Sequence, residues 1–287
     1  MSYEVLARKW RPQVFQDVIG QEHVTQTLIN AIKTDRLAHA YLFSGPRGVG
    51  KTSVARILAK AINCEKGDLG TPCNSCRSCV EITDGGSVDV QEIDGASNRG
   101  IDEIRDLRDN SKYMPSSSRY RIYIIDEVHM LTLPAFNALL KTLEEPPAHV
   151  KFIFATTESH KVPVTILSRC QKFDFKRIPP TKIVSHLEGI AAKDNIRISQ
   201  SGLALIAREA EGSMRDAAGL PDQVDSFTGT EVEATHVTEI LGIIDRDMTL
   251  GATHAIIEGA PGKCLEIVDK INNYGYDFKE FYRTLMS

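Results

Sequence analysis

The sequence predicts an α/β protein, in which a domain built on a mostly parallel sheet is followed by a small helical domain and the start of a third, helical region. Three observations support this. Short apolar runs alternate with segments of helical periodicity, a glycine-rich loop joins the first run to its helix, and beyond Pro179 and Pro180 only helical periodicity remains. Strands that alternate with helices form parallel sheets covered by helices on both faces.

Each element has its own signal in the chain. Apolar and aromatic runs predict strands around residues 40–43, 88–93, 121–125, 151–155 and 173–175. Apolar residues three or four positions apart predict helices around residues 24–32, 54–62, 101–107 and 136–143. The predicted domains are residues 1–179, 180–242 and 243–287. The last stops within a helical pattern, so we expect that domain to be truncated.

Composition excludes several classes of protein. Of the 287 residues, 42% are hydrophobic and 25% are charged, so packed cores are expected rather than wholesale disorder. The net charge of −4 is unlike that of a free-standing nucleic-acid binder, so contact with DNA requires a local patch or an assembly. The sequence has neither an apolar run of about 18 residues nor a signal peptide, so we expect a cytoplasmic protein with no membrane partner.

The glycine-rich loop matches a phosphate-binding pattern. It lies between a strand and a helix and reads Gly45-Pro46-Arg47-Gly48-Val49-Gly50-Lys51-Thr52, or G-x-x-x-x-G-K-T. Glycines let backbone N–H groups close around phosphate oxygens, and the helix N-terminus adds a favourable dipole. We expect Lys51 to reach the β- and γ-phosphates of ATP and Thr52 to ligate Mg²⁺.

An acidic pair ends the strand of residues 121–125. Because parallel strands place their C-terminal ends at one edge, we expect Asp126 and Glu127 beside the phosphate loop. Asp126 is expected to hold Mg²⁺ through water, and Glu127 to act as the general base toward the attacking water. Thr157 follows the strand of residues 151–155, where its hydroxyl could orient that water or could cap a turn.

Three arginines have roles that the residues alone leave open. Arg169 could act in trans on a neighbour's nucleotide, because its fork suits phosphate oxygens, or it could be a surface charge. Arg215 could lean over the phosphates or form an ion pair on its helix. Arg99, with Gly100 and Ile101, could bind a backbone phosphate of DNA, or the segment could be an ordinary helix cap.

Four cysteines are clustered after the helix that follows the phosphate loop. The pattern is C-x8-C-x2-C-x2-C, and the cysteines are Cys64, Cys73, Cys76 and Cys79. Two-residue spacing is typical of zinc ligands, because a tight turn brings both sulfurs to one tetrahedral ion. The segment is too polar for free thiols in a core, and disulfides are rare in the cytosol. We therefore expect a closed, structural Zn²⁺ site in residues 64–79, and packed thiols at Cys170 and Cys264.

Together these motifs resemble the AAA+ ATPases, and more closely the gamma/tau family of bacterial DNA polymerase III, the ATPase motors of the sliding-clamp loader. The resemblance covers essentially all 287 residues. Cysteines inserted directly after the phosphate-loop helix make it more specific than the loop alone. Other matching stretches are YEVLARKWRP, IGQEH, IDEVH, ALLKTLEEP and ILSRC, at residues 3–12, 19–23, 125–129, 138–146 and 166–170.

The resemblance implies a role for each candidate. Lys51 and Thr52 correspond to Walker A, and Asp126 and Glu127 to Walker B. Sensor 1, sensor 2 and the arginine finger that completes the adjacent subunit's site correspond to Thr157, Arg215 and Arg169. The adenine pocket corresponds to Ala7, Arg11, Val18 and Ile19. The segment around Arg99, with Gly100 and Ile101, corresponds to a helix start that tracks template DNA.

The resemblance also implies cofactors and partners. The cofactors are ATP, Mg²⁺ and Zn²⁺. Residues 180–242 form a lid and residues 243–287 begin an oligomerising collar. The expected partners are the other subunits of a hetero-pentamer, the sliding clamp and primer–template DNA, and a longer form is a candidate to bind polymerase and helicase. The expected location is the bacterial cytoplasm, in association with the nucleoid.

One departure and three alternatives accompany this hypothesis. Pro221 stands where the family has leucine within a helix, and proline there should kink the chain just after Arg215. The alternatives are a non-hydrolysing structural clamp-loader subunit, another DNA-remodelling AAA+ machine such as a helicase or branch-migration motor, and a zinc-ribbon DNA-binding module. The intact Walker residues argue against the first and the cysteine insertion against the second. The third is disfavoured because the cysteine segment carries only Lys66 and Arg77 as cations.

Overall fold

Five parallel strands form the centre of the first domain in this computed structural model. It describes residues 6–67, 70–194, 196–220, 236–238, 246–273 and 277–286. The strands are β1 (Ala40–Ser44), β2 (Val90–Asp94), β3 (Arg121–Asp126), β4 (Val150–Thr156) and β5 (Gln171–Asp174). Their order is β2-β3-β4-β1-β5, and every neighbouring pair is parallel. The predicted parallel sheet is thus confirmed.

Two strand boundaries differ from the prediction. Val88 is 65% exposed and precedes β2, because the chain turns at Ser87 and Asp89 before it joins the sheet. Phe175 lies one residue beyond β5, yet it is buried against Phe43 and its N–H donates to the Ser44 carbonyl. An apolar residue next to a strand can therefore be exposed or buried, and the sequence pattern alone did not distinguish the two cases.

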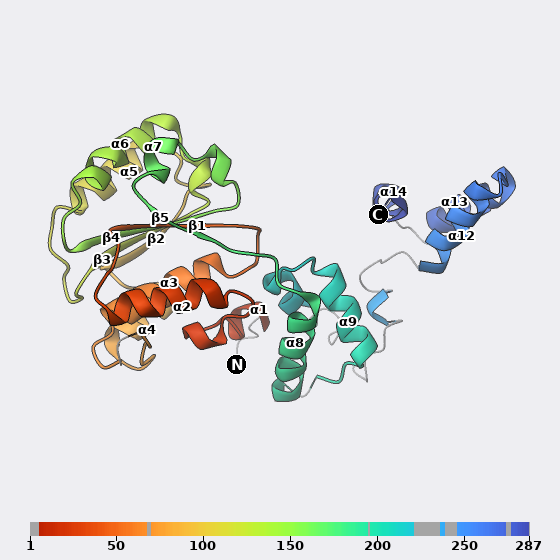
Figure 1. Ribbon diagram of the computed structural model, residues 1–287, viewed down its shortest axis with the longest axis horizontal. Coiled ribbons are helices and arrows are strands. Elements are labelled where there is room, and N and C mark those ends of the chain that lie inside the picture. Colours follow the sequence, from red (N-terminus) through yellow and green to blue (C-terminus); the bar gives the residue numbers. More distant parts are fainter. Residues whose placement is uncertain are drawn as a thin grey trace.

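Helices cover both faces of the sheet (Figure 1). One face carries α2 (Glu22–Lys33), α3 (Lys51–Asn63) and α4 (Arg77–Asp84). The other carries α5 (Ile101–Asn110), α6 (Leu133–Glu144) and α7 (Val164–Leu167). Side chains alternate along each strand, so Tyr41 and Phe43 join the core under α2 and α3, while Ala40 and Leu42 join the core under α5 and α6.

The second domain is helical, as predicted. It contains α8 (Pro180–Asp194) and α9 (Gln200–Glu209), with further helical turns at residues 214–220 and 236–238. Its core includes Ile183, Leu187 and Ile206, and Trp10 from the N-terminal segment packs against it. That segment contains the short helices α1 (Leu6–Lys9) and η1 (Phe15–Asp17). The expected kink at Pro221 lies outside the described residues.

The last region consists of α12 (Arg246–Ile257), α13 (Pro261–Asn273) and α14 (Phe278–Met286). These helices share a small core of Ala252, Ile271 and Phe281. They lie apart from the sheet domain (Figure 1). Among the described residues, no helix combines the length and apolar character needed to cross a membrane.

Asp89 ties the start of β2 to the loop before β3, and its removal should weaken the fold. Its buried carboxylate accepts backbone N–H bonds from Ser116, Ser117 and Ser118 at 2.6, 2.8 and 2.9 Å. Burial raises the pKa of Asp89, but these three donors outweigh burial and hold the pKa below its ordinary value. We expect Asp89→Asn to lower the free energy of unfolding by about 2 kcal/mol at pH 7.

The dependence on pH follows from the sign of this shift. A carboxyl whose pKa is lower in the folded state stabilises fully above its unfolded pKa of about 3.9 and loses that contribution as the pH falls further. In urea unfolding, the deficit of Asp89→Asn should therefore be constant from pH 7 to about pH 4 and shrink as the pH falls below that. Asp84→Asn, at an exposed position nearby, is the matched control. Equal stability of the wild type and Asp89→Asn at pH 7 would contradict this account of the loop.

Candidate active site

The glycine-rich loop connects β1 to α3 and depends on backbone conformations that glycine allows. Gly48 and Gly50 have φ angles of 74° and 101°, a region that side chains with a Cβ rarely occupy. At Gly48 a Cβ would also lie 1.9 Å from Ser213 Oγ. Lys51 is the first residue of α3. The loop therefore presents the N-terminus of α3 to the space in front of it.

Lys51 is buried within the curve of this loop. Its side-chain ammonium donates to the carbonyls of Gly45 and Pro46 at 2.8 and 2.7 Å. Burial lowers the pKa of Lys51, while the nearby charges of Glu127 and Asp126 act in the opposite direction. A buried cation of this kind is stabilised by added negative charge, so the position suits an anionic ligand.

The loop and the acidic strand end meet directly. Thr52 Oγ1 donates a hydrogen bond to Asp126 Oδ2 at 2.6 Å. Both groups are hard oxygen donors of the kind that Mg²⁺ prefers. The structure thus brings together the two residues that the sequence predicted as the magnesium site.

Glu127 is held by two neighbours, Thr157 and His129. Its backbone is in the left-handed region, with φ 45°. Its carboxylate accepts hydrogen bonds from the hydroxyl and the N–H of Thr157, at 3.0 and 3.3 Å. The Nδ1 atom of His129 lies 3.3 Å from the same Oε2 atom. Thr157 therefore contacts Glu127 here, whereas the cap or turn role that the sequence also allowed has no support from these bonds.

His129 was not predicted from the sequence. Its ring Nδ1 also lies 3.0 Å from Thr156 Oγ1, and its Nε2 lies 3.1 Å from Glu158 Oε2. Its position within the stretch IDEVH, two residues after Glu127, is a signal that could have identified it.

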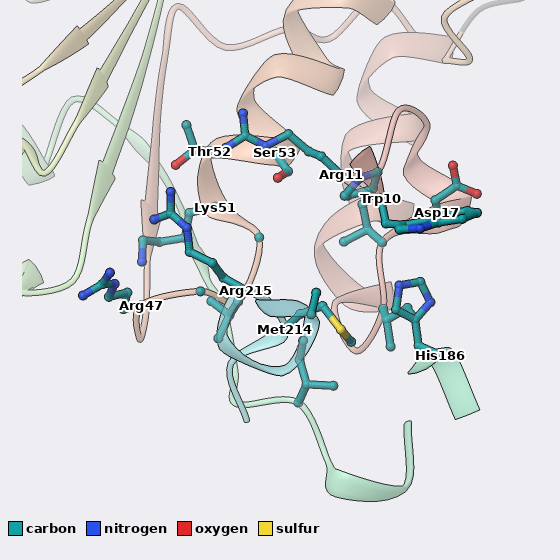
Figure 2. Close-up of a pocket in the computed structure, with 18 of the residues that line it drawn as sticks. Trp10, Arg11, Asp17, Arg47, Lys51, Thr52, Ser53, His186, Met214 and Arg215 are labelled. Carbon is teal, nitrogen blue, oxygen red and sulfur yellow. The ribbon is translucent and has the colours of Figure 1, made fainter. Parts of the chain in front are cut away.

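A pocket lies in front of the loop and is closed by the N-terminal segment and the second domain (Figure 2). Arg11, Val18 and Ile19 line it, as expected, whereas the side chain of Ala7 lies outside the described residues. Figure 2 shows the side chains of Arg11 and Arg215 extending toward Lys51, Thr52 and Ser53. The lining also includes residues that the sequence did not predict, among them Trp10, Asp17, His186 and Met214.

The second domain is bonded to the phosphate loop through Gly48. The carbonyl of Gly48 accepts hydrogen bonds from the N–H groups of Met214 and Arg215 at 3.0 and 3.2 Å. These bonds fix the backbone of Arg215 at the start of the helical residues 214–220, and its side chain lines the pocket. The sequence left open an ion pair on the helix or a position over the phosphates, and the structure places Arg215 beside the phosphate loop.

Arg169 is not among the residues that line this pocket. It follows α7, and its guanidinium donates to Glu144 Oε1 at 2.6 Å and to the Thr165 carbonyl at 2.7 Å. Its side chain is 31% exposed, so the guanidinium is accessible from outside this chain. This placement excludes a role in the chain's own pocket as it stands.

The segment from Arg99 to Ile101 leads into α5, and the loop before it contacts the acidic strand end. Arg99 is exposed, and its Nε donates to the Ala96 carbonyl at 2.9 Å. In the same loop, the N–H of Gly95 donates to the Asp126 carbonyl at 2.8 Å. A Cβ at Gly95 would lie 2.8 Å from the Glu127 carbonyl, so this loop packs directly on the candidate catalytic pair.

The four clustered cysteines form a site that fits zinc. Their sulfur atoms all lie within 4.8 Å of one another, and those of Cys64 and Cys76 are 4.0 Å apart. A disulfide needs about 2.05 Å, whereas four sulfurs at about 2.3 Å from one tetrahedral ion are separated by nearly 4 Å. Contrary to the sequence expectation for a polar segment, Cys76 and Cys79 are buried, so half of this cluster is part of the core.

The environment of the sulfurs suits thiolates to different degrees. Backbone N–H groups of Ser75 and Cys76 donate to Cys73 Sγ and lower the pKa of Cys73 to about 5. Burial raises the pKa of Cys79. A divalent cation among the sulfurs would favour the thiolate form of all four. The surroundings of the cluster therefore favour the thiolate form of Cys73, whereas Cys79 favours the thiol form unless a metal ion supplies positive charge.

Three family profiles together match nearly the whole chain. They are described as DNA polymerase III, delta subunit, at residues 20–179, as the ATPase lid domain of a DNA polymerase III clamp loader subunit, at residues 182–229, and as domain III of DNA polymerase III subunits gamma and tau, at residues 232–287.

Curated relatives carry the same names. The chain is 53% identical to DNA polymerase III subunit tau of Bacillus subtilis, over 92% of this chain and 46% of the relative. It is 49% identical to DNA polymerase III subunit tau of Escherichia coli, over 97% of this chain and 43% of the relative. It is 43% identical to subunit gamma of Buchnera aphidicola from Acyrthosiphon pisum, over 98% of the chain and 78% of the relative. The chain thus spans about half the length of the tau relatives.

Solved structures match the fold. The RuvB Holliday junction branch migration motor of Thermotoga maritima has a TM-score of 0.62 at 18% identity, covering 86% of this chain and 79% of that one. At this identity the match is one of fold alone, and it confirms the predicted AAA+ architecture.

The contact at Gly48 predicts a specific defect. Gly48→Ala should displace Ser213 and Arg215 from the loop and weaken ATP binding by at least tenfold, measured by calorimetric titration. Gly85→Ala is the matched control, because Gly85 also has a positive φ but has no atom within 4 Å of an added Cβ. Unchanged affinity in Gly48→Ala would show that the lid contact does not shape the pocket.

The cysteine cluster predicts bound metal. Elemental analysis of the purified chain should find about one Zn²⁺ per molecule, and Cys79→Ser should bind it more weakly because it replaces a soft ligand with a hydroxyl. Removal of Zn²⁺ by a chelator should lower the thermal unfolding midpoint. A chain that is fully folded, equally stable and free of metal would refute the zinc site.

Proposed function

The chain belongs to the gamma and tau subunit family of bacterial DNA polymerase III, and from this we propose that it is an ATP-hydrolysing motor subunit of the clamp loader. The observation that carries the proposal is the meeting of Lys51, Thr52, Asp126 and Glu127 at one edge of the sheet. Binding alone needs the first two of these residues, whereas hydrolysis needs the acidic pair as well.

Nucleotide binding uses the loop and both flanking segments. Backbone N–H groups of the loop and the start of α3 bind phosphate oxygens. The Lys51 ammonium exchanges its two carbonyl acceptors for the β- and γ-phosphates. Arg11 and Arg215 contribute positive charge from the N-terminal segment and the lid, and Val18 and Ile19 pack against the base. Thr52, and Asp126 through water, would hold Mg²⁺, which would supply positive charge to neutralise the phosphates.

Hydrolysis requires a base and a way to hold it. The Glu127 carboxylate accepts a proton as the water oxygen attacks the γ-phosphorus, and the bond to the leaving ADP oxygen breaks. In the structure, Thr157 donates two hydrogen bonds to one oxygen of this carboxylate, Oε2. Those bonds orient Glu127, and Thr157 can turn its hydroxyl toward the attacking water or the γ-phosphate instead.

Arg169 supplies charge to a second copy of this kind of site. It lies outside the chain's own pocket, is accessible, and is hydrogen-bonded to Glu144. A guanidinium that enters a neighbouring subunit's pocket would stabilise charge on the transferred phosphoryl group. We therefore assign Arg169 a role in trans, within a hetero-pentamer of clamp-loader subunits.

Clamp and DNA are the proposed substrates of the assembly. Arg99, Gly100 and Ile101 lie at the start of α5, where an exposed arginine and backbone N–H groups suit a DNA phosphate. Their loop packs on Asp126 and Glu127, so contact with primer–template DNA can influence the catalytic pair. A polymerase or helicase would bind a longer form, and nucleoid association in the cytoplasm would follow from contact with DNA.

A second candidate is a structural clamp-loader subunit that does not hydrolyse ATP. It is favoured by one observation, the match of residues 20–179 to a profile described as the delta subunit. The intact acidic pair and the hydrogen-bonded Thr52–Asp126 contact favour the hydrolysing subunit instead.

Two variants separate binding from catalysis in trans. Lys51→Ala should weaken ATP binding by at least a hundredfold. Arg169→Ala should leave binding within twofold and reduce ATP turnover at least a hundredfold in the assembled complex. Arg177→Ala, another exposed arginine with an acidic partner, is the control. If Arg169→Ala lowered single-turnover hydrolysis equally in the unassembled chain, the role in trans would be wrong.

The proposed function as a whole is tested by ATP turnover of the chain, in its full-length form, with partner subunits. Turnover should rise when both the sliding clamp and primed DNA are added, and clamp should become topologically linked to circular DNA. ATP binding without any turnover under these conditions would favour the structural subunit.

A further inference from the structure

Lys60 is a buried cation at the junction of three segments. It lies on α3 and is 1% exposed. Its ammonium donates to Gln13 Oε1 at 2.5 Å, to Asn74 Oδ1 at 2.8 Å and to Thr83 Oγ1 at 3.3 Å. These acceptors are neutral, and burial of an ammonium without a charged partner is costly. A negative charge close to the Lys60 ammonium would offset this cost.

Two of the three acceptors belong to the cysteine segment and to α4, which packs beside α3 (Figure 1). Asn74 lies in the turn between Cys73 and Cys76, with φ 55°, a conformation that asparagine tolerates. Thr83 donates to the carbonyl of Cys79 at 2.9 Å. Burial lowers the pKa of Lys60, and Cys79 acts in the opposite direction. Four thiolates around one Zn²⁺ carry net negative charge, which would favour the buried ammonium.

The third acceptor leads to the nucleotide pocket. Gln13 accepts from Lys60 through its side-chain oxygen and donates from its side-chain nitrogen to the Arg11 carbonyl at 3.1 Å. Arg11 lines the pocket in front of the phosphate loop. One continuous set of hydrogen bonds thus runs from Asn74 through Lys60 and Gln13 to the backbone of Arg11.

We propose that Lys60 is a positioning residue that couples the zinc-loaded cysteine cluster to the nucleotide pocket. The inference rests on the proposed function, because it requires both Zn²⁺ and ATP to bind where stated. With Zn²⁺ bound, the turn at Asn74 and the charge of the cluster hold the ammonium, which in turn holds Gln13 and Arg11. Without Zn²⁺, we expect the turn at Asn74 to become less ordered and the hydrogen bond from Lys60 to Gln13 in the N-terminal segment to weaken.

Coupling between two binding sites is reciprocal. If Zn²⁺ tightens ATP binding by some factor, ATP must tighten Zn²⁺ binding by the same factor. We expect a factor of about five, at the lower end of ordinary couplings. Two ratios measure this coupling. The first is the affinity for a non-hydrolysable ATP analogue with Zn²⁺ bound, divided by the affinity after a zinc-selective chelator has removed Zn²⁺ in excess Mg²⁺. The second is the affinity for Zn²⁺ with the analogue bound, divided by the affinity without it.

Lys60→Met tests the assignment, because methionine keeps an unbranched apolar stem and removes the charge. Both ratios should fall to about one, while the variant still binds Zn²⁺ and the analogue separately. Lys66→Met is the matched control, since Lys66 is exposed in the same cysteine segment. It should retain the wild-type ratios.

Other outcomes are equally informative. A folded Lys60→Met variant that keeps both ratios would overturn the proposal. Should that variant fail to fold, Gln13→Leu breaks the same path from the other end, and full coupling in it would overturn the proposal too. ATP affinity that is measurable but independent of Zn²⁺ in the wild type would refute this inference alone. No measurable affinity in either state would refute the proposed function and this inference with it.

Discussion

The hydrogen bond from Thr52 to Asp126 joins the loop after β1 to the end of β3, and the candidate active site depends on it. Both strands are parallel to β4, which lies between them in fixed register. A shift of one residue in either strand would displace the loop and the acidic end by about 3.3 Å relative to each other and turn the shifted strand's side chains to the other face. The apolar alternation that specifies the sheet register therefore also places the two residues predicted to ligate magnesium.

Other parts of the protein converge on the same edge. The loop that leads to Arg99 reaches it through Gly95, the lid reaches it through Gly48, and Thr157 reaches it through Glu127. The contacts at Gly95 and Gly48 are backbone hydrogen bonds at positions where a Cβ would clash, and the contact of Thr157 is made to the Glu127 carboxylate. The lid and the loop before α5 are therefore both joined directly to this edge of the sheet.

The sequence was sufficient for the fold class, the phosphate loop, the acidic pair and the cysteine cluster, because each depends on local spacing or on periodicity. It was not sufficient for Val88 and Phe175, since the burial of a residue beside a strand depends on how the adjoining chain turns. Roles for Gly95 and Lys60 were also missed, because their partners are distant in the chain, and His129 was missed although it lies two residues after Glu127. The kink at Pro221 and the adenine contact of Ala7 stay predictions.

The central claim is that Glu127, held by Thr157 and set beside the Thr52–Asp126 contact, is the base for ATP hydrolysis. The most direct measurement is the single-turnover rate of ATP hydrolysis in Glu127→Gln, together with its ATP affinity, in the assembled complex. Glutamine keeps the shape and can still accept a hydrogen bond from Thr157, but it cannot take up the proton from water. We predict wild-type affinity within about twofold and a rate reduced by about a hundredfold or more. A rate within threefold of the wild type would contradict the assignment of Glu127.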